Sequence, residues 1–390
     1  MNWKETKWKE LEQLADNLIN YYNFTNKIKF YIAGDNCYGF ESICKALDIE
    51  YEFINIGNTG PVLTAFSRKD GIIIVDTPRQ MRISKTFEKI LEPLGLEKNL
   101  HYFIVDNEDL LNFMSEIFPI IYAKIYNRWY VPQVQVTLTT RCTLKCKDCG
   151  NGCNHWDKTD KSNDLTFEDT KAAIDALFNK AHFVDRINML GGETLLCQDV
   201  LKQIYKYIKK QYLKRYRRLG LFTNGTIIPS HELLQTLKDC NVTLFISDYS
   251  TASFDAGKRI GELLYNLRKY KIDFFVFHEK LRWFDYQLYE TEHSQEEGDK
   301  IRKICITQYP YLRCPEVIND MLYVCSMAYV TLKSKKIDIK KENGLKLSNV
   351  TNVLYAVKYF RGLAEDIKSC QYCNGIEGNK LLCGVQEDEL

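Results

Sequence analysis

Residues 142–149 read Cys-Thr-Leu-Lys-Cys-Lys-Asp-Cys, which places three cysteines in the spacing C-x3-C-x2-C shortly after a predicted strand at 133–138. Three thiolates on one loop can hold three irons of a four-iron cubane and leave the fourth iron open to a small molecule. Cys153 follows four positions after the third cysteine, so a four-cysteine cluster or a zinc site stays open as an alternative. We expect Cys153 and His155 to be loop residues beside the cluster.

The composition sets limits on the class of protein. The chain has 390 residues, 45% hydrophobic and 27% charged, which is typical of a globular protein with two or three domains. Its 53 basic and 51 acidic residues leave a charge of +2, so no overall field favours nucleic acid. We find no secretory leader and no run of 18 apolar residues, and we expect a cytoplasmic protein without a membrane partner. The high count of 14 cysteines then indicates metal binding and not disulfides, although we expect Cys37, Cys44, Cys197 and Cys240 to be buried and unligated.

The alternation of apolar and helical stretches predicts three segments. In the first, apolar runs separated by helical patterns predict a small parallel sheet, with strands at 28–33, 51–56, 71–76 and 101–105. We assign 1–130 to this Rossmann-like domain, although its turn Gly34-Asp-Asn-Cys-Tyr-Gly39 has Asn36 where the nucleotide-binding pattern has glycine.

Five further strands alternate with helices and predict a partial (β/α) barrel, at 133–138, 184–190, 220–223, 242–247 and 272–277. In such barrels the chemistry lies at the carboxyl ends of the strands, which is where the cysteine motif falls. We assign 131–284 to this core. From 285 the alternation stops and cysteines become frequent, so 285–390 is a third, cluster-binding segment.

Together with Gly191-Gly192-Glu193 at the end of the second strand, the cysteine motif resembles the radical S-adenosylmethionine (SAM) superfamily. The resemblance implies a partial (β/α)6 barrel and a [4Fe–4S] cluster held by Cys142, Cys146 and Cys149, with SAM on the open iron. An electron donor such as flavodoxin or ferredoxin would reduce the cluster. The 5′-deoxyadenosyl radical would then abstract hydrogen from a small-molecule substrate.

The resemblance also implies that strand ends contact SAM, with Glu193 accepting a hydrogen bond from its ammonium group. A branched side chain at Gly192 should then weaken SAM binding and spare the cluster. Asp148 departs from the aromatic residue that the family often has there. The residues expected at the cofactor are Gly191, Gly192, Glu193, Thr223, Asn224, Ser247 and Asp248.

The C-terminal cysteines resemble the twitch module, a shortened SPASM domain that holds one auxiliary [4Fe–4S] cluster. The resemblance implies four ligands: Cys314, Cys325, Cys370 and Cys373. The hairpin glycine of that module is replaced by Asp320, next to Asn319, and both residue types tolerate left-handed backbone. Cys305 and Cys383 are extra, and Cys305 is a candidate hydrogen donor.

The whole chain resembles radical SAM proteins of surface-polysaccharide loci, so we expect oxidation or epimerisation of a polar small molecule such as a sugar or nucleotide sugar. One alternative is a peptide-modifying radical SAM maturase, which shares the barrel and the auxiliary cluster but often carries a winged-helix domain. The second alternative is a non-enzymatic, zinc-stabilised binding protein.

Overall fold

The computed structural model divides into two compact units, which are described separately. The first comprises Met1–Pro132, Ala181–Phe183 and Asn352–Leu363, and the second comprises Gln133–Lys180, Val184–Thr351 and Ala364–Leu390. The structure describes residues 2–34, 39–54, 70–76, 88–89, 91–104, 112–147, 149–278, 282–284, 292–308, 313, 315–326, 328, 344–364, 367–376 and 380–386. Within these ranges, no helix is long and apolar enough to span a bilayer.

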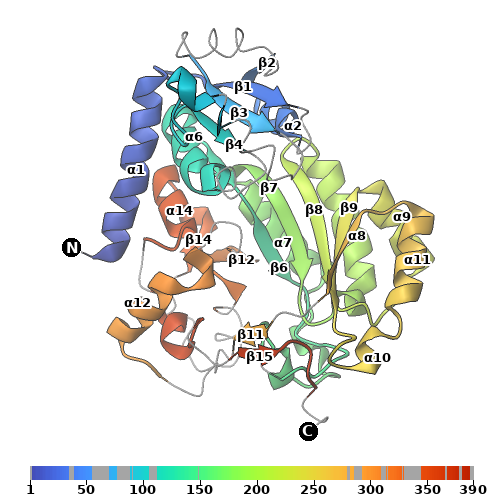
Figure 1. Cartoon of the computed structure of the whole chain (residues 1–390). Helices are drawn as coiled ribbons and strands as arrows, with labels where there is room; N and C mark the ends of the chain where they lie inside the picture. The colour runs from blue at the N-terminus through green and yellow to red at the C-terminus, as the bar shows by residue number, and fades with distance from the viewer. Residues whose placement is uncertain are drawn as a thin grey trace. The chain divides into compact units, whose positions relative to one another are not determined.

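Four parallel strands form the sheet of the first unit, in the order β2-β1-β3-β4 (Figure 1). They are β1 (Lys29–Gly34), β2 (Glu50–Ile54), β3 (Ile72–Asp76) and β4 (Tyr102–Ile104). The other elements are α1 (Trp3–Tyr21), α2 (Phe40–Leu47), η1 (Glu92–Leu94), the π-helical turn η2 (Phe113–Ile117), α6 (Phe118–Tyr126), β5 (Trp129–Val131) and α14 (Val353–Phe360). The predicted parallel sheet is confirmed, while most of the turn between Gly34 and Gly39 lies outside the described residues.

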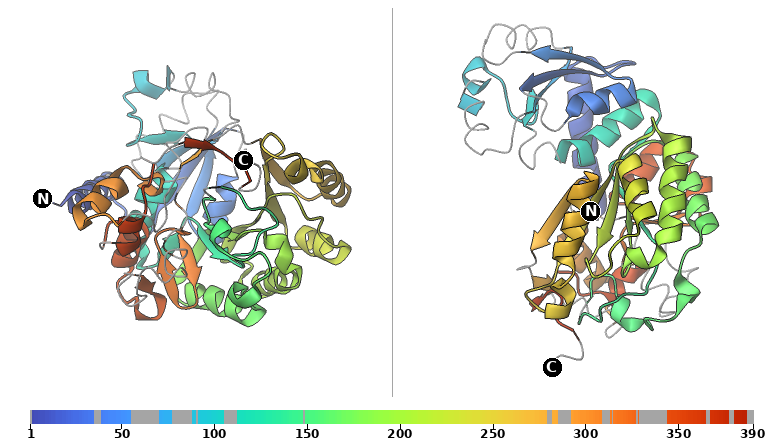
Figure 2. Two further views of the ribbon diagram at one scale, coloured as in Figure 1. Left: turned by 90° about the horizontal axis from the view of Figure 1, so that it is seen from below. Right: turned by 90° about the vertical axis from the view of Figure 1, so that its right-hand side faces the viewer.

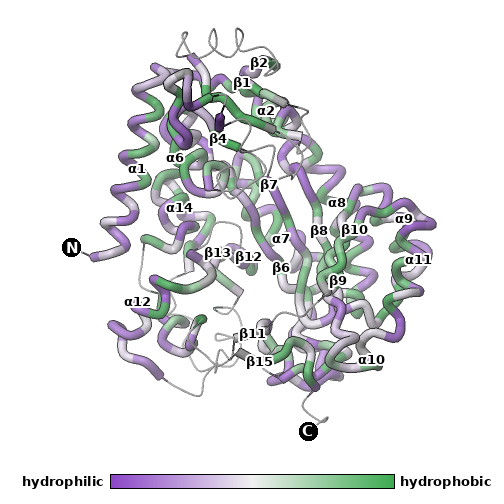
Figure 3. The backbone as a smooth tube through the Cα atoms, in the orientation of Figure 1, coloured by the Kyte–Doolittle hydropathy of each residue, from purple (hydrophilic) through white to green (hydrophobic). Residues whose placement is uncertain are grey.

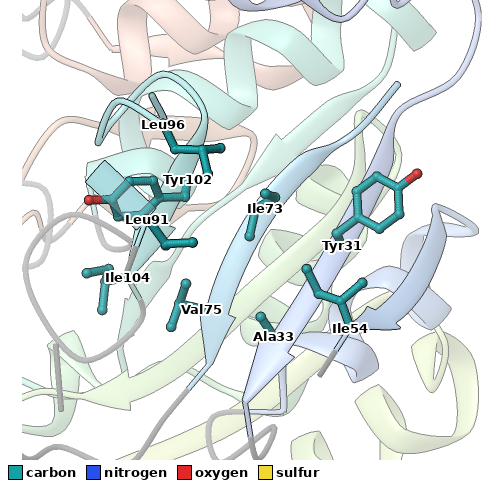
Figure 4. Close-up of a cluster of buried hydrophobic side chains, with 9 residues drawn as sticks. All are labelled: Tyr31, Ala33, Ile54, Ile73, Val75, Leu91, Leu96, Tyr102 and Ile104. Carbon is teal, nitrogen blue, oxygen red and sulfur yellow. The ribbon is translucent and has the colours of Figure 1, made fainter. Parts of the chain in front are cut away.

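Both faces of this sheet are packed. Alternate residues of the strands, together with two leucines that flank η1, build one apolar cluster (Figure 4). It consists of Tyr31, Ala33, Ile54, Ile73, Val75, Leu91, Leu96, Tyr102 and Ile104. On the opposite face Phe30 packs edge-on against Phe40 and Phe113, with ring centroids 5.1 and 6.1 Å away. A sheet covered on both faces requires continuous apolar strands, which explains why these runs were recognisable in the sequence.

The second unit is built on five parallel strands that follow one another in sequence order (Figures 1 and 2). They are β6 (Val134–Thr137), β7 (Ala181–Leu190), β8 (Tyr216–Thr223), β9 (Val242–Asp248) and β10 (Phe274–His278). The helices between them are α7 (Phe167–Phe178), α8 (Gln198–Tyr212), α9 (His231–Asp239), α10 (Phe254–Gly257) and α11 (Ile260–Tyr270). The expected partial barrel is confirmed, and the described residues supply five of its strands.

Side-chain alternation separates the two faces of this sheet. Val136, Met189, Leu221 and Leu244 share one level of the register and are fully buried. Strand β9 is mainly hydrophobic in Figure 3, whereas α9 and α11 also carry hydrophilic stretches. Helix α7 begins with the predicted capping box, because Thr166 and its partner Asp169 satisfy each other's backbone N–H groups.

Short elements follow β10. They are β11 (Arg282–Phe284), α12 (Gln295–Ile304), β12 (Glu316–Ile318), β13 (Met321–Tyr323), β14 (Leu345–Lys346), η9 (Lys368–Tyr372) and β15 (Lys380–Leu382), with single turns η3 (Cys153–His155), η4 (Lys161–Asn163), η5 (Thr194–Cys197), η6 (Ile306–Gln308) and η8 (Leu347–Asn349). Strands β12 and β13 form the expected hairpin. Asn319 takes the left-handed conformation at its turn, with φ of 52°, while the Asp320 carboxylate accepts from the N–H of Ser348.

Candidate active site

The cysteine loop connects β6 to α7 and carries the three motif cysteines. Cys142 and Cys149 are half-buried, and Cys146 is buried. Burial raises the pKa of the Cys142 and Cys146 thiols, whereas hydrogen bonding with Cys153 lowers the pKa of Cys149 to about 7. Iron binds these sulfurs as thiolates, so coordination would reverse the effect of burial on the first two.

Nitrogen donors are directed at two of these sulfur atoms. The backbone N–H of Leu144 and the side-chain amide of Asn224 lie 3.4 and 3.5 Å from Cys142 Sγ. Gln386 Nε2 lies 3.2 Å from Cys146 Sγ. N–H groups at such distances stabilise thiolate charge and tune bound iron–sulfur clusters. Sequence reasoning missed Gln386, since a single glutamine near the C-terminus belongs to no motif.

The glycine turn after β7 packs directly on the cysteine loop. The N–H groups of Gly192 and Glu193 donate to the carbonyls of Thr139 and Arg141, each at 2.9 Å. A Cβ at Gly191 would lie 2.5 Å from the Thr139 carbonyl oxygen, and one at Gly192 would overlap the Arg141 carbonyl. A branched side chain at Gly192 would therefore displace the backbone next to Cys142. From the structure we therefore predict that such a change disturbs the cluster site, whereas the sequence alone predicted that the cluster would be spared.

Glu193 is fully buried and joins the ends of two strands. Its Oε1 accepts from Leu195 N–H and Thr223 Oγ1–H at 2.9 and 2.8 Å, and its Oε2 accepts from Asn224 N–H at 2.8 Å. Burial raises the pKa of this carboxyl to about 7. Both oxygens thus accept hydrogen bonds inside the protein, and the expected contact of Glu193 with the SAM ammonium group stays a prediction. In this structure Glu193 positions the turn that follows β8.

That turn brings Asn224 to the cysteine loop. Asn224 Nδ2 also donates to Thr143 Oγ1 at 3.1 Å, while its Oδ1 accepts from the N–H of Thr226 at 3.0 Å. Thr223 Oγ1 accepts from Gly225 N–H, and Gly225 has φ of 74°, a left-handed conformation that favours glycine. Thr223 and Asn224, both predicted at the cofactor, thus hydrogen-bond to Glu193, and Asn224 also donates to the Cys142 sulfur.

Ser247 and Asp248 lie at the end of the next strand, β9. In the sheet register Ser247 lies beside Phe277, and Asp248 beside His278. Asp248 is buried, and its Oδ1 accepts from the N–H of Ser250 at 2.9 Å. The expected role of Ser247 and Asp248 at SAM stays a prediction.

An ion pair anchors the residue that precedes the first cysteine. The guanidinium of Arg141 bonds Asp164 through Nε and Nη2, at 3.0 and 2.5 Å from the two carboxylate oxygens. Thr139 Oγ1 donates to the same carboxylate at 2.5 Å. Hydrogen bonding to Asp164 raises the pKa of Arg141. Asp164 lies 22 positions after Cys142 in a polar loop, so its partnership with Arg141 could not be read from the sequence.

Aromatic side chains line the face of the parallel sheet opposite the buried Met189 level. Phe222, Phe245 and Phe275 occupy one register level on β8, β9 and β10. Their rings stack across the strands, with centroids 4.8 and 5.8 Å apart. Phe277 also stacks on Phe245 at 6.2 Å. Phe275 and Phe277 are 59% and 41% exposed, so ring surface is available to a ligand on this face.

Four C-terminal cysteines lie near one another. After burial, the largest contributions raising the pKa of Cys325 come from the thiols of Cys370 and Cys305, and Cys373 adds to them. The N–H of Gly375 lies 3.3 Å from Cys373 Sγ. The proposed ligand Cys314 lies outside the described residues. Sequence reasoning had set Cys305 apart as an extra cysteine, whereas the structure places it within this group.

The residues of the cysteine loop fit an iron–sulfur cluster by their chemistry. Three thiols on one loop are supplied with N–H donors at two sulfurs, and two glycines leave the adjoining backbone free of side chains. In the described part of the chain, no three His, Cys, Asp or Glu side chains converge as ligands of one metal ion. The fit of this loop to a cluster is therefore supported by its three thiols, the N–H groups near their sulfur atoms and the adjoining glycines.

Comparisons with known proteins identify the family of this unit. Residues 136–274 match the model of the radical SAM superfamily. A 110-residue stretch is 27% identical to the uncharacterized protein MJ0907 of Methanocaldococcus jannaschii, covering 28% of this chain and 36% of that protein. The chain thus matches about a third of this relative's length.

Two solved structures show weaker similarity. Native anSMEcpe with bound AdoMet and Kp18Cys peptide is 16% identical over 38% of this chain and 42% of its own, with a TM-score of 0.30. Native anSMEcpe with bound AdoMet is 12% identical over 65% of this chain and 94% of its own, with a TM-score of 0.39. Scores this low carry no weight, so the assignment rests on the family match. Residues 136–274 therefore form a radical SAM domain, and that superfamily uses a [4Fe–4S] cluster and SAM.

Proposed function

We propose that this radical SAM enzyme holds its cluster through Cys142, Cys146 and Cys149 and acts on a polar small molecule, oxidising or epimerising a carbon of a sugar or nucleotide sugar. When bound, the cluster and SAM supply the 5′-deoxyadenosyl radical that takes a hydrogen atom from the substrate. A small electron-transfer protein such as flavodoxin or ferredoxin would supply the electron. The family match covers the cysteine motif, which argues against the alternative of a zinc-stabilised binding protein.

The observation that carries the proposal is the joining of three strand ends around Cys142. The loop after β6 carries the cysteines, the glycine turn after β7 bonds to the carbonyl of Arg141, and Asn224 after β8 donates to the Cys142 sulfur. Carboxyl ends of parallel strands are where α/β barrels place their chemistry. The glycine turn leaves backbone uncovered beside the cysteines, which suits the close approach of a small cofactor.

The substrate class is supported by the aromatic face. The exposed rings of Phe275 and Phe277 both lie on β10, whose carboxyl end pairs with the proposed cofactor contacts Ser247 and Asp248. Flat ring surfaces bind ligands that present a face of C–H groups or a planar base, which sugars and nucleotide sugars do. The first unit is a parallel sheet, in contrast to the winged-helix domain often found in peptide-modifying relatives.

We further propose one auxiliary [4Fe–4S] cluster at the C-terminal cysteines. The thiols of Cys370 and Cys373 raise the pKa of Cys325, which supports these three as ligands, and Cys314 is the fourth proposed ligand. A cluster with four protein thiolates has no open iron, so it would serve as an electron acceptor or a structural element. Because Cys305 also raises the pKa of Cys325, we propose it as an alternative to Cys314 among the ligands, or as a hydrogen donor in an epimerisation.

Anaerobic reconstitution with iron and sulfide tests the proposal. We expect about eight iron atoms per chain if each cluster is a cubane. Reductant and SAM should then give 5′-deoxyadenosine, and candidate nucleotide sugars should increase its formation and yield an oxidised or epimerised product. Zinc in place of iron, or product formation only with peptides, would contradict the proposal.

A further inference from the structure

We propose that Gln386 is a positioning residue of the radical SAM site, which holds the cysteine loop and raises the reduction potential of the cluster by donating an N–H to Cys146. The inference rests on the proposed ligand role of Cys146. It adds a residue more than 230 positions away in sequence, in a segment to which the motif gives no role.

Gln386 contacts the cysteine loop through both the oxygen and the nitrogen of its side-chain amide. Its Oε1 accepts from the backbone N–H of Lys145 at 2.7 Å, and its Nε2 lies 3.2 Å from Cys146 Sγ. The same Nε2 donates to the carbonyl of Gly384 at 2.7 Å, which fixes the direction of the amide group. An amide has two N–H donors, so Nε2 can serve the Gly384 carbonyl and the sulfur together.

The backbone of the same segment adds to this contact. Lys147 N–H donates to the Val385 carbonyl at 2.8 Å, and Cys146 forms an antiparallel bridge with Gln386. Both neighbours of Cys146 are thus bonded to residues 385–386. In Figure 1 this last described stretch continues from β15 toward the C-terminus.

Gly384 allows the segment to reach the loop. Its φ is 83°, a left-handed conformation, and a Cβ there would lie 2.7 Å from Tyr249 Cβ. Tyr249 follows β9, whose end carries Asp248. The segment therefore lies between the end of β9 and the cysteine loop, and a residue with a side chain at position 384 would displace it.

The expected effect on the cluster follows from charge. A reduced cluster carries one more negative charge than an oxidised one, so an N–H directed at a ligand sulfur stabilises the reduced form more. Loss of that N–H should make reduction harder. A hydrogen bond to a charged group is stronger than one to a neutral group, so we expect its loss to lower the ratio of reduced to oxidised cluster about tenfold at a fixed potential.

The experiment measures the reduction potential of the reconstituted full-length protein by EPR-monitored titration. The signal that changes when SAM is added identifies the cluster of interest. Gln386→Met removes both amide contacts at similar length, and Gln386→Glu keeps an acceptor for Lys145 N–H while replacing the donor by a negative charge. Gln203→Glu is the control, since Gln203 is an exposed residue of α8 whose Nε2 donates to the Asp199 carbonyl.

We expect Gln386→Met to lower the reduced fraction at a fixed potential about tenfold, which is about 59 mV for a one-electron couple, and Gln386→Glu to lower it further. Gln203→Glu should match wild type. Unchanged potentials in both Gln386 variants with normal iron content would overturn the inference, as would loss of iron in both, which would make Gln386 a structural anchor alone. A wild-type protein without any SAM-responsive cluster would instead overturn the proposed function.

Discussion

The two cysteine groups of this chain are built in different ways. The first stands on one loop, and neighbouring strand ends bond to it through the Gly192 turn and Asn224. The second is assembled from the end of α12, the β13 hairpin and η9, which are short elements far apart in sequence. The cysteines of the first group are brought together by their spacing on one loop, whereas those of the second are brought together by the packing of several elements. For the first group we therefore predict the effect of changes to the surrounding backbone, and for the second we predict which thiols are ligands.

The largest expected effect is at the backbone contact of the first group. Gly192→Val should displace Arg141 and Cys142, because a Cβ would overlap the Arg141 carbonyl and lie 3.0 Å from Cys142 Cβ. We expect loss of the SAM-responsive cluster and of 5′-deoxyadenosine formation by more than tenfold, measured by EPR and chromatography. Gly261→Ala is the control, since a Cβ at this helical position meets nothing within 4 Å and alanine favours helix. Normal SAM cleavage by Gly192→Val would contradict this prediction, because it would show that the glycine turn can shift without displacing the cysteine loop.

The second group offers a comparison of two thiols. Cys373→Ala should remove about half of the iron and leave SAM cleavage measurable, because the first cluster does not use this residue. If Cys305 is a ligand, Cys305→Ala should remove as much iron as Cys373→Ala.

If Cys305 donates hydrogen instead, iron should stay at the wild-type level while turnover stops after hydrogen abstraction. Cys240→Ala provides the control, because Cys240 is a buried cysteine at the end of α9. Iron and product unchanged in both Cys305→Ala and Cys373→Ala would contradict the auxiliary cluster.

The ion pair between Arg141 and Asp164, next to the first cysteine group, is expected to have an intermediate effect on stability and iron binding. Asp164→Asn removes the charge that holds Arg141 and leaves a buried guanidinium with weaker partners. We expect a loss of stability of about 1–3 kcal/mol and weaker iron retention on dilution. Thermal unfolding and iron release to a chelator measure these. Asp255→Asn, at an exposed pair with Lys258, should change neither.

The smallest expected effect is the pH dependence from Glu193. Burial raises the pKa of this carboxyl to about 7, above its unfolded value of 4.5. Between these values the unfolded chain ionises before the folded one, so stability should fall as pH rises from about 4.5 to about 7. Glu193→Gln should flatten this slope, and also lower stability by about 1–3 kcal/mol because its amide nitrogen faces the Asn224 N–H. Buried Glu316, whose pKa is likewise raised to about 7, should leave a residual slope. An identical slope in the variant would contradict the protonation of Glu193.

The sequence predicted the features that depend on local patterns. Apolar runs predicted the strands of both sheets, and Thr166 with Asp169 predicted the start of α7, since these signals lie within a few residues. The spacing of the motif predicted three cysteines on one loop. Each of these features needs only neighbouring residues to be formed.

Features that depend on tertiary contacts could not be predicted. The burial of Glu193 depends on Thr223 and Asn224, about 30 positions away, and the motif did not show that both oxygens would be engaged. The approach of Gln386 to Cys146 and of Cys305 to Cys325 depends on how the C-terminal segment folds back. Spacing gives no information about such contacts.

The central claim is that Cys142, Cys146 and Cys149 hold the cluster at which SAM is cleaved. The most direct measurement compares 5′-deoxyadenosine formation by the reconstituted wild-type protein with that of a variant in which all three cysteines are alanine. The account predicts 5′-deoxyadenosine from the wild type, none from the variant, and about half the wild-type iron in the variant at the C-terminal cysteines. 5′-Deoxyadenosine from the triple variant at the wild-type rate would contradict it.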